Sequence, residues 1–165
     1  LAGYDLVVAG MLLTPDTDDI LVRRGVRDSK TLSNSRILDL SKLIKENCPS
    51  EVLSLPPPQY DLAYQQHGRN LTRLLAWAHA QVIDRLGQRV RVDKAMSDQF
   101  GDESLLTEAL ETVGCTIPVE QRRRAERHLA VAAASVVARA EFVSAIHRHR
   151  AASSISRLSS IMAHQ

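Results

Sequence analysis

Four stretches of the chain carry the apolar pattern of β-strands. Residues 6–13 form a continuous apolar run, which predicts a strand buried on both faces and ended by the Thr-Pro pair that follows. Residues 51–55 predict a second, short strand, because the three prolines at 56–58 cannot continue a ladder of hydrogen bonds. Residues 90–98 and 116–119 predict two more strands.

The segments between these strands place apolar residues at helical spacing. One helix is expected directly after Ser33, whose side chain can cap it. The clearest helix is residues 70–86, where the apolar side chains form one stripe and Gly87 is expected to end the helix. Further helices are expected over about 103–113 and about 129–149. Because strands alternate with helices, the sequence predicts an α/β domain layered around a central sheet.

Composition narrows the class of protein. The chain has 165 residues, of which 44% are hydrophobic, enough for one domain with a core of its own. Two cysteines are too few for a disulfide framework and no secretory segment precedes them, so we expect a reducing, cytoplasmic location. The longest apolar run, residues 129–138, is too short and too polar-flanked to predict a membrane span. We expect no membrane partner and see no sign of an obligate protein partner.

The chain divides into a domain over residues 1–150 and a tail over residues 151–165. The tail is rich in serine, and we expect it to be poorly ordered. Within the domain, the formal net charge of +2 permits a polyanionic partner without requiring one. The positive charge is clustered, and each cluster is either a solvated face or a surface for a polyanion. The first cluster is Arg23, Arg24, Arg27 and Lys30, and the second is Arg122, Arg123, Arg124 and Arg127.

Two isolated acids stand at the ends of predicted elements. Asp98 ends the run 90–98, and Glu126 lies just ahead of a helix whose first turns are mostly small residues. Small residues let another backbone or a substrate approach closely, here at Ala130, Ala132, Ala133 and Ala134. Acids at strand and helix ends are typical of metal-dependent phosphodiester cleavage. From the residues alone, the simpler interpretations are favoured: Asp98 is a turn residue before Gly101, and Glu126 is a helix-start acid paired with neighbouring arginines.

Several motifs, in a fixed order, carry a resemblance. They are Gly-Val-Arg-Asp-Ser-Lys-Thr-Leu-Ser at 25–33, Leu-Pro-Pro at 55–57 followed by Tyr60, Asn-Leu-Thr-Arg-Leu-Leu-Ala-Trp-Ala-His at 70–79, Asp-Gln-Phe at 98–100, and Ala-Glu at 125–126 with Ala-Ala-Ala-Ser at 132–135. Over about residues 6–149 the sequence resembles the type 2 ribonuclease H family, and specifically its ribonuclease HIII branch. The resemblance implies a ribonuclease H-like mixed β-sheet flanked by helices.

The resemblance also implies an activity. In that family four acids hold two divalent ions, Mg²⁺ or Mn²⁺, for hydrolysis of the RNA strand of an RNA–DNA hybrid duplex. It assigns Asp98 and Glu126 as metal-binding catalytic acids. The products of this cleavage carry 5′-phosphate and 3′-hydroxyl ends.

Five polar residues are candidates for contact with nucleic acid. Ser29 and Lys30 lie in a loop that can hold phosphates, and the alternative is an ordinary loop before Ser33. Asn70 and Arg73 lie at a helix start, where free N–H groups attract anions, and the alternative is simple N-capping by Asn70. Ser135 either bonds its own helix backbone or lies near substrate. Trp77 and His79 are expected to pack rather than to bind a ligand.

The sequence also departs from the family pattern. Family members open with a strand that ends in Asp-Glu, together with a Gly-Lys-Gly or Gly-Arg-Gly turn, directly upstream of the strand that is here residues 6–13. This sequence starts at Leu1, so that first strand, two of the four acids and the turn are absent from it. We therefore expect an amino-terminally truncated domain whose neighbouring strands expose backbone donors and acceptors. The alternative to an active endoribonuclease is a catalytically inactive remnant that binds nucleic acid, or a fragment with no function of its own.

Overall fold

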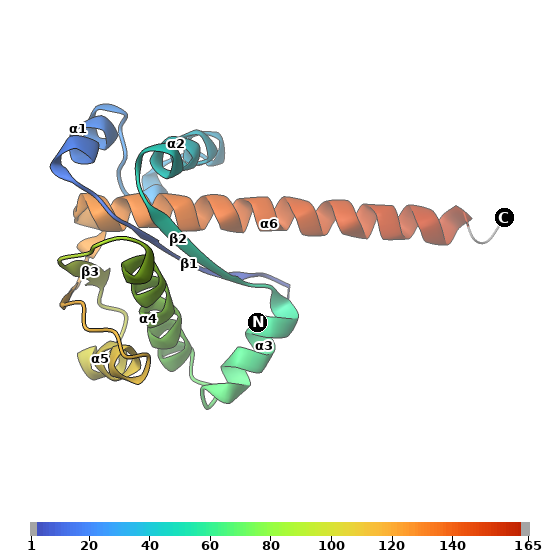
Figure 1. Cartoon of the computed structure of the whole chain (residues 1–165). Helices are drawn as coiled ribbons and strands as arrows, with labels where there is room; N and C mark the ends of the chain where they lie inside the picture. The colour runs from blue at the N-terminus through green and yellow to red at the C-terminus, as the bar shows by residue number, and fades with distance from the viewer. Residues whose placement is uncertain (1–2, 163–165) are drawn as a thin grey trace.

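The computed structural model describes residues 3–162 of the chain, and the side chains of residues 3–152 (Figure 1). Strands and helices alternate through the first two-thirds of it, and one long helix closes the fold. The elements are β1 (Leu6–Met11), α1 (Pro15–Arg23), η1 (Ser29–Thr31), α2 (Asn34–Asn47), β2 (Ser50–Leu55), α3 (Pro57–Gln66), α4 (Leu71–Arg89), β3 (Ala95–Asp98), α5 (Glu103–Thr112), β4 (Val119–Arg122), η2 (Ala125–Arg127) and α6 (Leu129–Met162), where η1 and η2 are single 3₁₀ turns.

The strands form two separate pairs. β1 runs antiparallel to β2, with Leu6 opposite Leu55 and Met11 opposite Ser50. β3 runs parallel to β4 and ends with Asp98 opposite Arg122. In the described residues each strand has one hydrogen-bonded neighbour. Parallel and antiparallel pairs among helices confirm the predicted mixed α/β fold.

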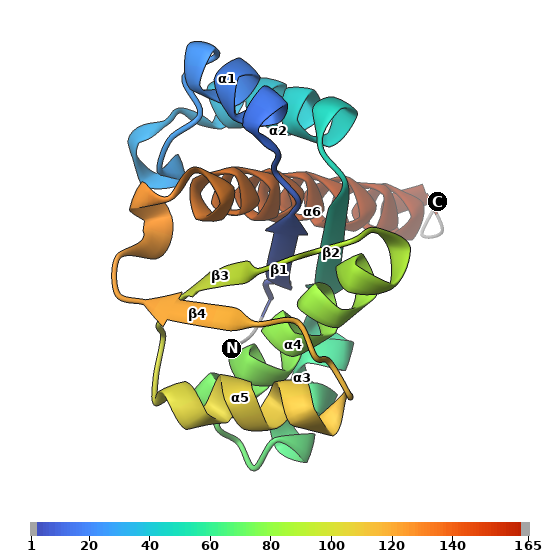
Figure 2. The ribbon, with the colours of Figure 1, turned by 60° about the vertical axis from the view of Figure 1, so that its left-hand side comes forward.

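The helices cover the strands on both sides (Figures 1 and 2). α6 crosses one face of the β1–β2 pair, with α1 and α2 packed beyond it, while α4 lies on the opposite face and α5 packs against α4. The main core cluster joins α1, α2 and α6 through Leu21, Val26, Ile37, Leu40, Ile44, Cys48, Ala133, Val136, Val137 and Ala140. Helices thus cover the first strand on both faces, as predicted, but among β1 residues only Val8 is fully buried, because one edge of the strand borders a cavity.

The predicted helix starts are confirmed by their caps. The hydroxyl of Ser33 accepts a hydrogen bond from the Arg36 N–H at 3.2 Å at the start of α2. The side-chain oxygen of Asn70 accepts one from the Arg73 N–H at 3.1 Å at the start of α4. Each cap satisfies a backbone donor that has no partner within its helix.

Two helices, α1 and α3, were not expected from the sequence. From the sequence, Pro15 and Pro57 are expected to end strands, but each stands in the first turn of a helix, where a missing N–H costs nothing. Thr14 forms a capping box with Thr17, which gives α1 a start signal that the apolar pattern lacks. α3 has no side-chain cap, so only its prolines mark its beginning.

Three predicted boundaries before α6 are wrong. Gly87 does not end α4, which continues to Arg89. A Cβ atom at position 87 would lie 2.4 Å from Cδ1 of Ile117, so this glycine allows close packing inside the helix. β3 is shorter than the run 90–98, and β4 begins at Val119, where the strand predicted over 116–119 ends, because pairing between β3 and β4 decides which residues are extended.

α6 continues past the predicted end at residue 149, since no glycine or proline stands between Leu129 and Met162 to stop it. The helix thus runs into the tail that was expected to be poorly ordered, and the last residues of that tail, 163–165, lie outside the described residues. By length and composition alone, the stretch Leu129–Ala152 is long and apolar enough to cross a membrane. Of an apolar 18-residue segment within it, 39% is buried inside the protein. The first half of this stretch supplies buried core residues, and helices in protein cores can have the same length and apolar character.

Candidate functional site

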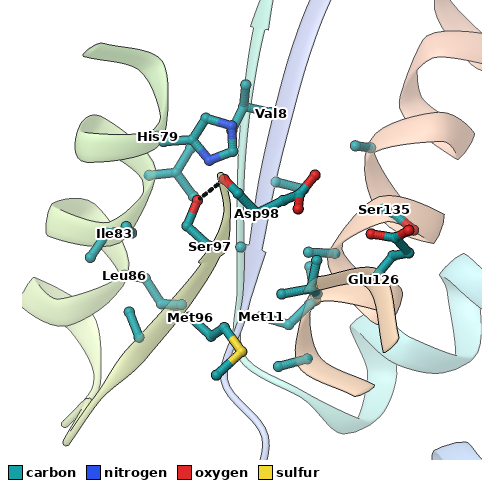
Figure 3. Close-up of a pocket in the computed structure, with 18 of the residues that line it drawn as sticks. Val8, Met11, His79, Ile83, Leu86, Met96, Ser97, Asp98, Glu126 and Ser135 are labelled. Carbon is teal, nitrogen blue, oxygen red and sulfur yellow. Dashed lines mark hydrogen bonds between the residues drawn. The ribbon is translucent and has the colours of Figure 1, made fainter. Parts of the chain in front are cut away.

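A cavity of about 470 Å³ opens between the two strand pairs (Figure 3). β1 and β3 line two of its sides, α4 and the first half of α6 line the others, and η1 reaches its rim. Most of the lining is apolar. Its charged side chains are Asp28, Lys30, Lys94, Asp98 and Glu126.

Asp98 and Glu126 are brought together by a backbone hydrogen bond. Asp98 ends β3, and its Oδ1 accepts the N–H of Ala125 at 3.1 Å. Ala125 is buried and precedes Glu126 in η2, and Arg124 enters that turn in the left-handed conformation, with φ 54°. Both carboxylates point into the cavity (Figure 3). Two acids 28 positions apart in the sequence therefore share one site, while their catalytic and metal-binding roles stay predictions.

Three of the five residues predicted to contact nucleic acid line the same cavity. They are Ser29, Lys30 and Ser135. Ser135 fits both of its alternatives, because its hydroxyl donates to the Ala132 carbonyl at 2.8 Å and the residue still lines the cavity. The loop that carries Ser29 and Lys30 is held to α6 by Arg139.

Arg139 does not line the cavity but positions the loop of Ser29 and Lys30, a role that the sequence does not predict. One guanidinium nitrogen donates to the Ser29 carbonyl at 2.5 Å, and the other donates to Oδ1 of Asn34 at 3.1 Å. Arg139 lies more than a hundred positions from these partners, so no local pattern indicates the contact. Its planar fork of donors suits such a double contact.

Asn70 and Arg73 do not line the cavity. The Asn70 side chain is used as the cap of α4, which matches the simpler of its two alternatives. Arg73 lies on the exposed side of the first turn. A role of these two residues in binding nucleic acid stays a prediction.

His79 packs as expected, but at the edge of the site. Its ring stacks on Phe100 with centroids 4.8 Å apart, and it also lines the cavity beside β3. Burial lowers the pKa of the His79 imidazole to about 4, and the nearby Asp98 carboxylate acts in the opposite direction without cancelling it. The ring is therefore neutral at neutral pH and adds no positive charge beside Asp98.

The donor set suits one divalent cation. Among the described residues no group of three or more His, Cys, Asp or Glu side chains is placed to hold a metal ion. Mg²⁺ and Mn²⁺ prefer oxygen ligands, and Mg²⁺ is commonly held by one or two carboxylates with water and substrate phosphates. Asp98 and Glu126 provide two such carboxylates for one ion, and a third acid, Asp28, also lines the cavity.

Comparison with known proteins identifies the family of this chain. The sequence model of the ribonuclease HII family matches residues 2–157. That match covers nearly the whole chain, and the chain belongs to this family.

Named relatives are ribonuclease HIII proteins. That of Protochlamydia amoebophila is 37% identical over 143 residues, which cover 87% of this chain and 47% of the relative. That of Chlamydia caviae is 42% identical over 128 residues, which cover 76% of this chain and 42% of the relative. The chain thus spans about half the length of the curated relatives it matches.

Solved structures agree with this placement. Bst-RNase HIII in complex with Mn²⁺ matches with a TM-score of 0.78 and 27% identity, over 86% of this chain and 47% of that one. The ribonuclease HII of Archaeoglobus fulgidus, solved with PCNA, matches with a TM-score of 0.74 and 31% identity, over 89% of this chain and 68% of that one. These likenesses confirm the expected ribonuclease H-like fold.

Proposed function

We propose that this chain forms part of a ribonuclease H that uses a divalent metal to cleave the RNA strand of RNA–DNA hybrids. The observation that carries the proposal is the hydrogen bond that sets Asp98 beside the turn holding Glu126, at the mouth of a cavity also lined by Ser29 and Lys30. Membership of the ribonuclease HII family and the Mn²⁺ complex of Bst-RNase HIII support the substrate and the metal. The two free cysteines are consistent with the proposed cytoplasmic location.

Each residue has a part in this proposal. Asp98 and Glu126 would hold the cation, and a cation so held activates water and offsets charge on the phosphodiester. Lys30 is exposed at the rim, where its ammonium can meet a backbone phosphate without reading the base sequence. Arg139 fixes the carbonyl of Ser29 and with it the position of this loop.

The second candidate function is binding of nucleic acid without cleavage. It is favoured by the finding that, in the part of the chain that the structure describes, no group of three or more His, Cys, Asp or Glu side chains is placed to hold a metal ion. In that case the exposed residues Arg123, Arg124 and Arg127, beside the site, would supply salt-sensitive affinity for phosphates.

Cleavage of a labelled RNA–DNA hybrid separates the two candidates. The parent chain, Asp98→Asn and Glu126→Gln are each incubated with Mg²⁺ or Mn²⁺. The matched control is Asp93→Asn, which changes an acid whose side chain is 83% exposed and does not itself line the cavity, although its neighbours Val92 and Lys94 do. Cleavage by the parent and by Asp93→Asn, but not by Asp98→Asn or Glu126→Gln, supports the proposed activity. A folded parent that binds the hybrid in a salt-sensitive way and does not cut it supports the second candidate.

A further inference from the structure

Arg124 has a left-handed backbone conformation, with φ 54° and ψ 41°, at the turn that connects β4 to η2. Among the described residues, Arg69 is the other residue besides glycine with a positive φ. This region is unfavourable for a residue with a side chain, because Cβ comes too close to the following carbonyl oxygen. Such strain persists where surrounding contacts determine the conformation, and it is common at functional sites.

Two hydrogen bonds of opposite direction close the turn around the end of β3. The Gln99 N–H donates to the Arg122 carbonyl at 2.9 Å, which extends the pairing of β3 with β4 by one step. The Ala125 N–H then donates back to Oδ1 of Asp98 at 3.1 Å. Only two residues separate these contacts along the second strand of the pair, so the chain has to turn sharply between them. The left-handed conformation of Arg124 provides that turn.

The same turn fixes both acids of the site. The hydrogen bond to Ala125, which is 1% exposed, holds Oδ1 of Asp98. The 3₁₀ turn η2 continues directly from there, with the His128 N–H donating to the Ala125 carbonyl at 2.8 Å, and it carries Glu126. Both carboxylates point into the cavity (Figure 3). A different backbone conformation at position 124 would move the Ala125 N–H away from Asp98 and turn Glu126 with it.

The side chain of Arg124 takes no part in this geometry. It is exposed, and within the described part of the chain its guanidinium makes no hydrogen bond or ion pair. The influence of position 124 on the two acids is therefore carried by its backbone.

We propose that Arg124 is a positioning residue whose left-handed backbone, and not its positive charge, sets Asp98 and Glu126 for binding a divalent cation. This inference rests on the proposed function, which assigns the cation to these two acids. If only a fraction of the folded molecules has the turn in this conformation, the apparent affinity for the cation is reduced by that fraction.

The test measures the affinity of the intact chain for Mn²⁺, by electron paramagnetic resonance, in three variants that all lack the guanidinium. Arg124→Gly enters the left-handed region freely and is expected to bind Mn²⁺ at least as tightly as the parent. Arg124→Ala enters it about as readily as Arg and is expected to stay within about threefold of the parent. Arg124→Val is branched at Cβ, which makes a positive φ rare, and is expected to bind at least about tenfold more weakly. Without metal, NMR should show the same order in the protection of the Ala125 amide from solvent exchange.

Arg69 provides the matched control. It has the same φ of 54°, follows α3, where its N–H donates to the Tyr64 carbonyl at 2.9 Å, and does not line the cavity. Arg69→Val strains the backbone in the same way and is expected to leave the Mn²⁺ affinity unchanged. A merely structural effect of the strain would instead weaken Mn²⁺ binding in both Val variants.

Equal Mn²⁺ affinities of folded Arg124→Gly and Arg124→Val would overturn the inference, and so would equal losses in Arg124→Val and Arg69→Val. The proposed function would stand in both cases if Asp98→Asn still loses affinity. A folded parent that binds no Mn²⁺ would overturn the proposed function and this inference together, so the two failures are distinguishable. Arg124→Thr, which is branched in the same way, replaces Arg124→Val if that variant does not fold.

Discussion

Around α1, α2 and the first half of α6, ten buried residues of the described chain form one core cluster. In contrast, α4 contributes one or two residues to each of three small clusters of three buried residues, which it shares with β1, α3 and α5. The cavity lies on the α4 side, between β1 and β3. Both regions use Leu, Val, Ile and Ala, so composition does not distinguish them. The difference shows that apolar residues pack densely only where the facing elements complete a layer. Two successive residues of α6 illustrate this, because Ala133 lies in the large cluster and Ala134 lines the cavity.

Leu-to-Ala changes on the two sides should separate the regions most strongly. Leu40 of α2 is 1% exposed within the large cluster, and Leu40→Ala is expected to lower the free energy of unfolding by about 2–5 kcal/mol. Leu75 of α4 already faces the cavity, so Leu75→Ala is expected to cost only about 1 kcal/mol. Urea unfolding of both variants measures the difference, and equal losses would mean that the cavity side is packed as tightly as the α2 side.

Acid should weaken the cavity side through His79. The pKa of His79 is about 4 in the folded protein and about 6.5 when unfolded, so between these values the unfolded chain binds more protons. Stability is therefore expected to fall as the pH drops from about 6.5 to 4, by at most about 3 kcal/mol from this residue. Unfolding of the parent and of His79→Gln across that range checks the prediction.

The acids Asp102 and Glu120 also lose stabilising contacts in acid, because hydrogen bonds from Ser104 and from Lys94 and Arg122 hold their pKa values below the usual range. That loss is common to the parent and to His79→Gln. Only the difference between the two curves reports on His79, and parallel curves would contradict its assignment as a neutral, enclosed histidine.

Two neighbouring alanines of α6 provide the reverse test. Ala133 is fully buried in the large cluster, and Ala133→Leu is expected to cost about 1–3 kcal/mol by overpacking. Ala134 lines the cavity, and Ala134→Leu is expected to change stability by less than about 1 kcal/mol, since there is room for the added atoms. Thermal unfolding of the two variants compares them directly. Similar losses in both would show that the space beside Ala134 is not available to a side chain.

The smallest expected effects are at the two helix caps. Ser33→Ala at α2 and Asn70→Ala at α4 are each expected to cost about 1 kcal/mol, because each removes one side-chain acceptor for a backbone N–H. Binding of an RNA–DNA hybrid by the Asn70 variant then tests its other predicted role. Weaker binding than that of Ser33→Ala at matched stability would assign Asn70 to the nucleic-acid surface as well as to the cap.

Much of the fold was predictable because its signals are local. The caps at Ser33 and Asn70, the stripe of α4 and the strand run beginning at Leu6 all lie within short windows of sequence. α1 and α3 were missed because a proline was interpreted only as the end of a strand, although it also favours the first turn of a helix.

The site was predictable in part for the same reason. Asp98 and Glu126 stand out at element ends, but their shared cavity depends on pairing of β3 with β4 and on the Ala125 hydrogen bond. Arg139 acquires its role from two contacts more than a hundred positions away in the sequence. No periodicity indicates such contacts, so they became visible only in the structure.

The most direct test of the account is titration of the intact chain with Mn²⁺, with free Mn²⁺ followed by electron paramagnetic resonance. If Asp98 and Glu126 hold the metal, the folded chain is expected to bind one ion, with affinity at least tenfold weaker in Asp98→Asn and in Glu126→Gln and unchanged in Asp93→Asn. Mn²⁺ binding that is the same in the parent and in the first two variants would show that these acids do not form the metal site, and would contradict the central claim.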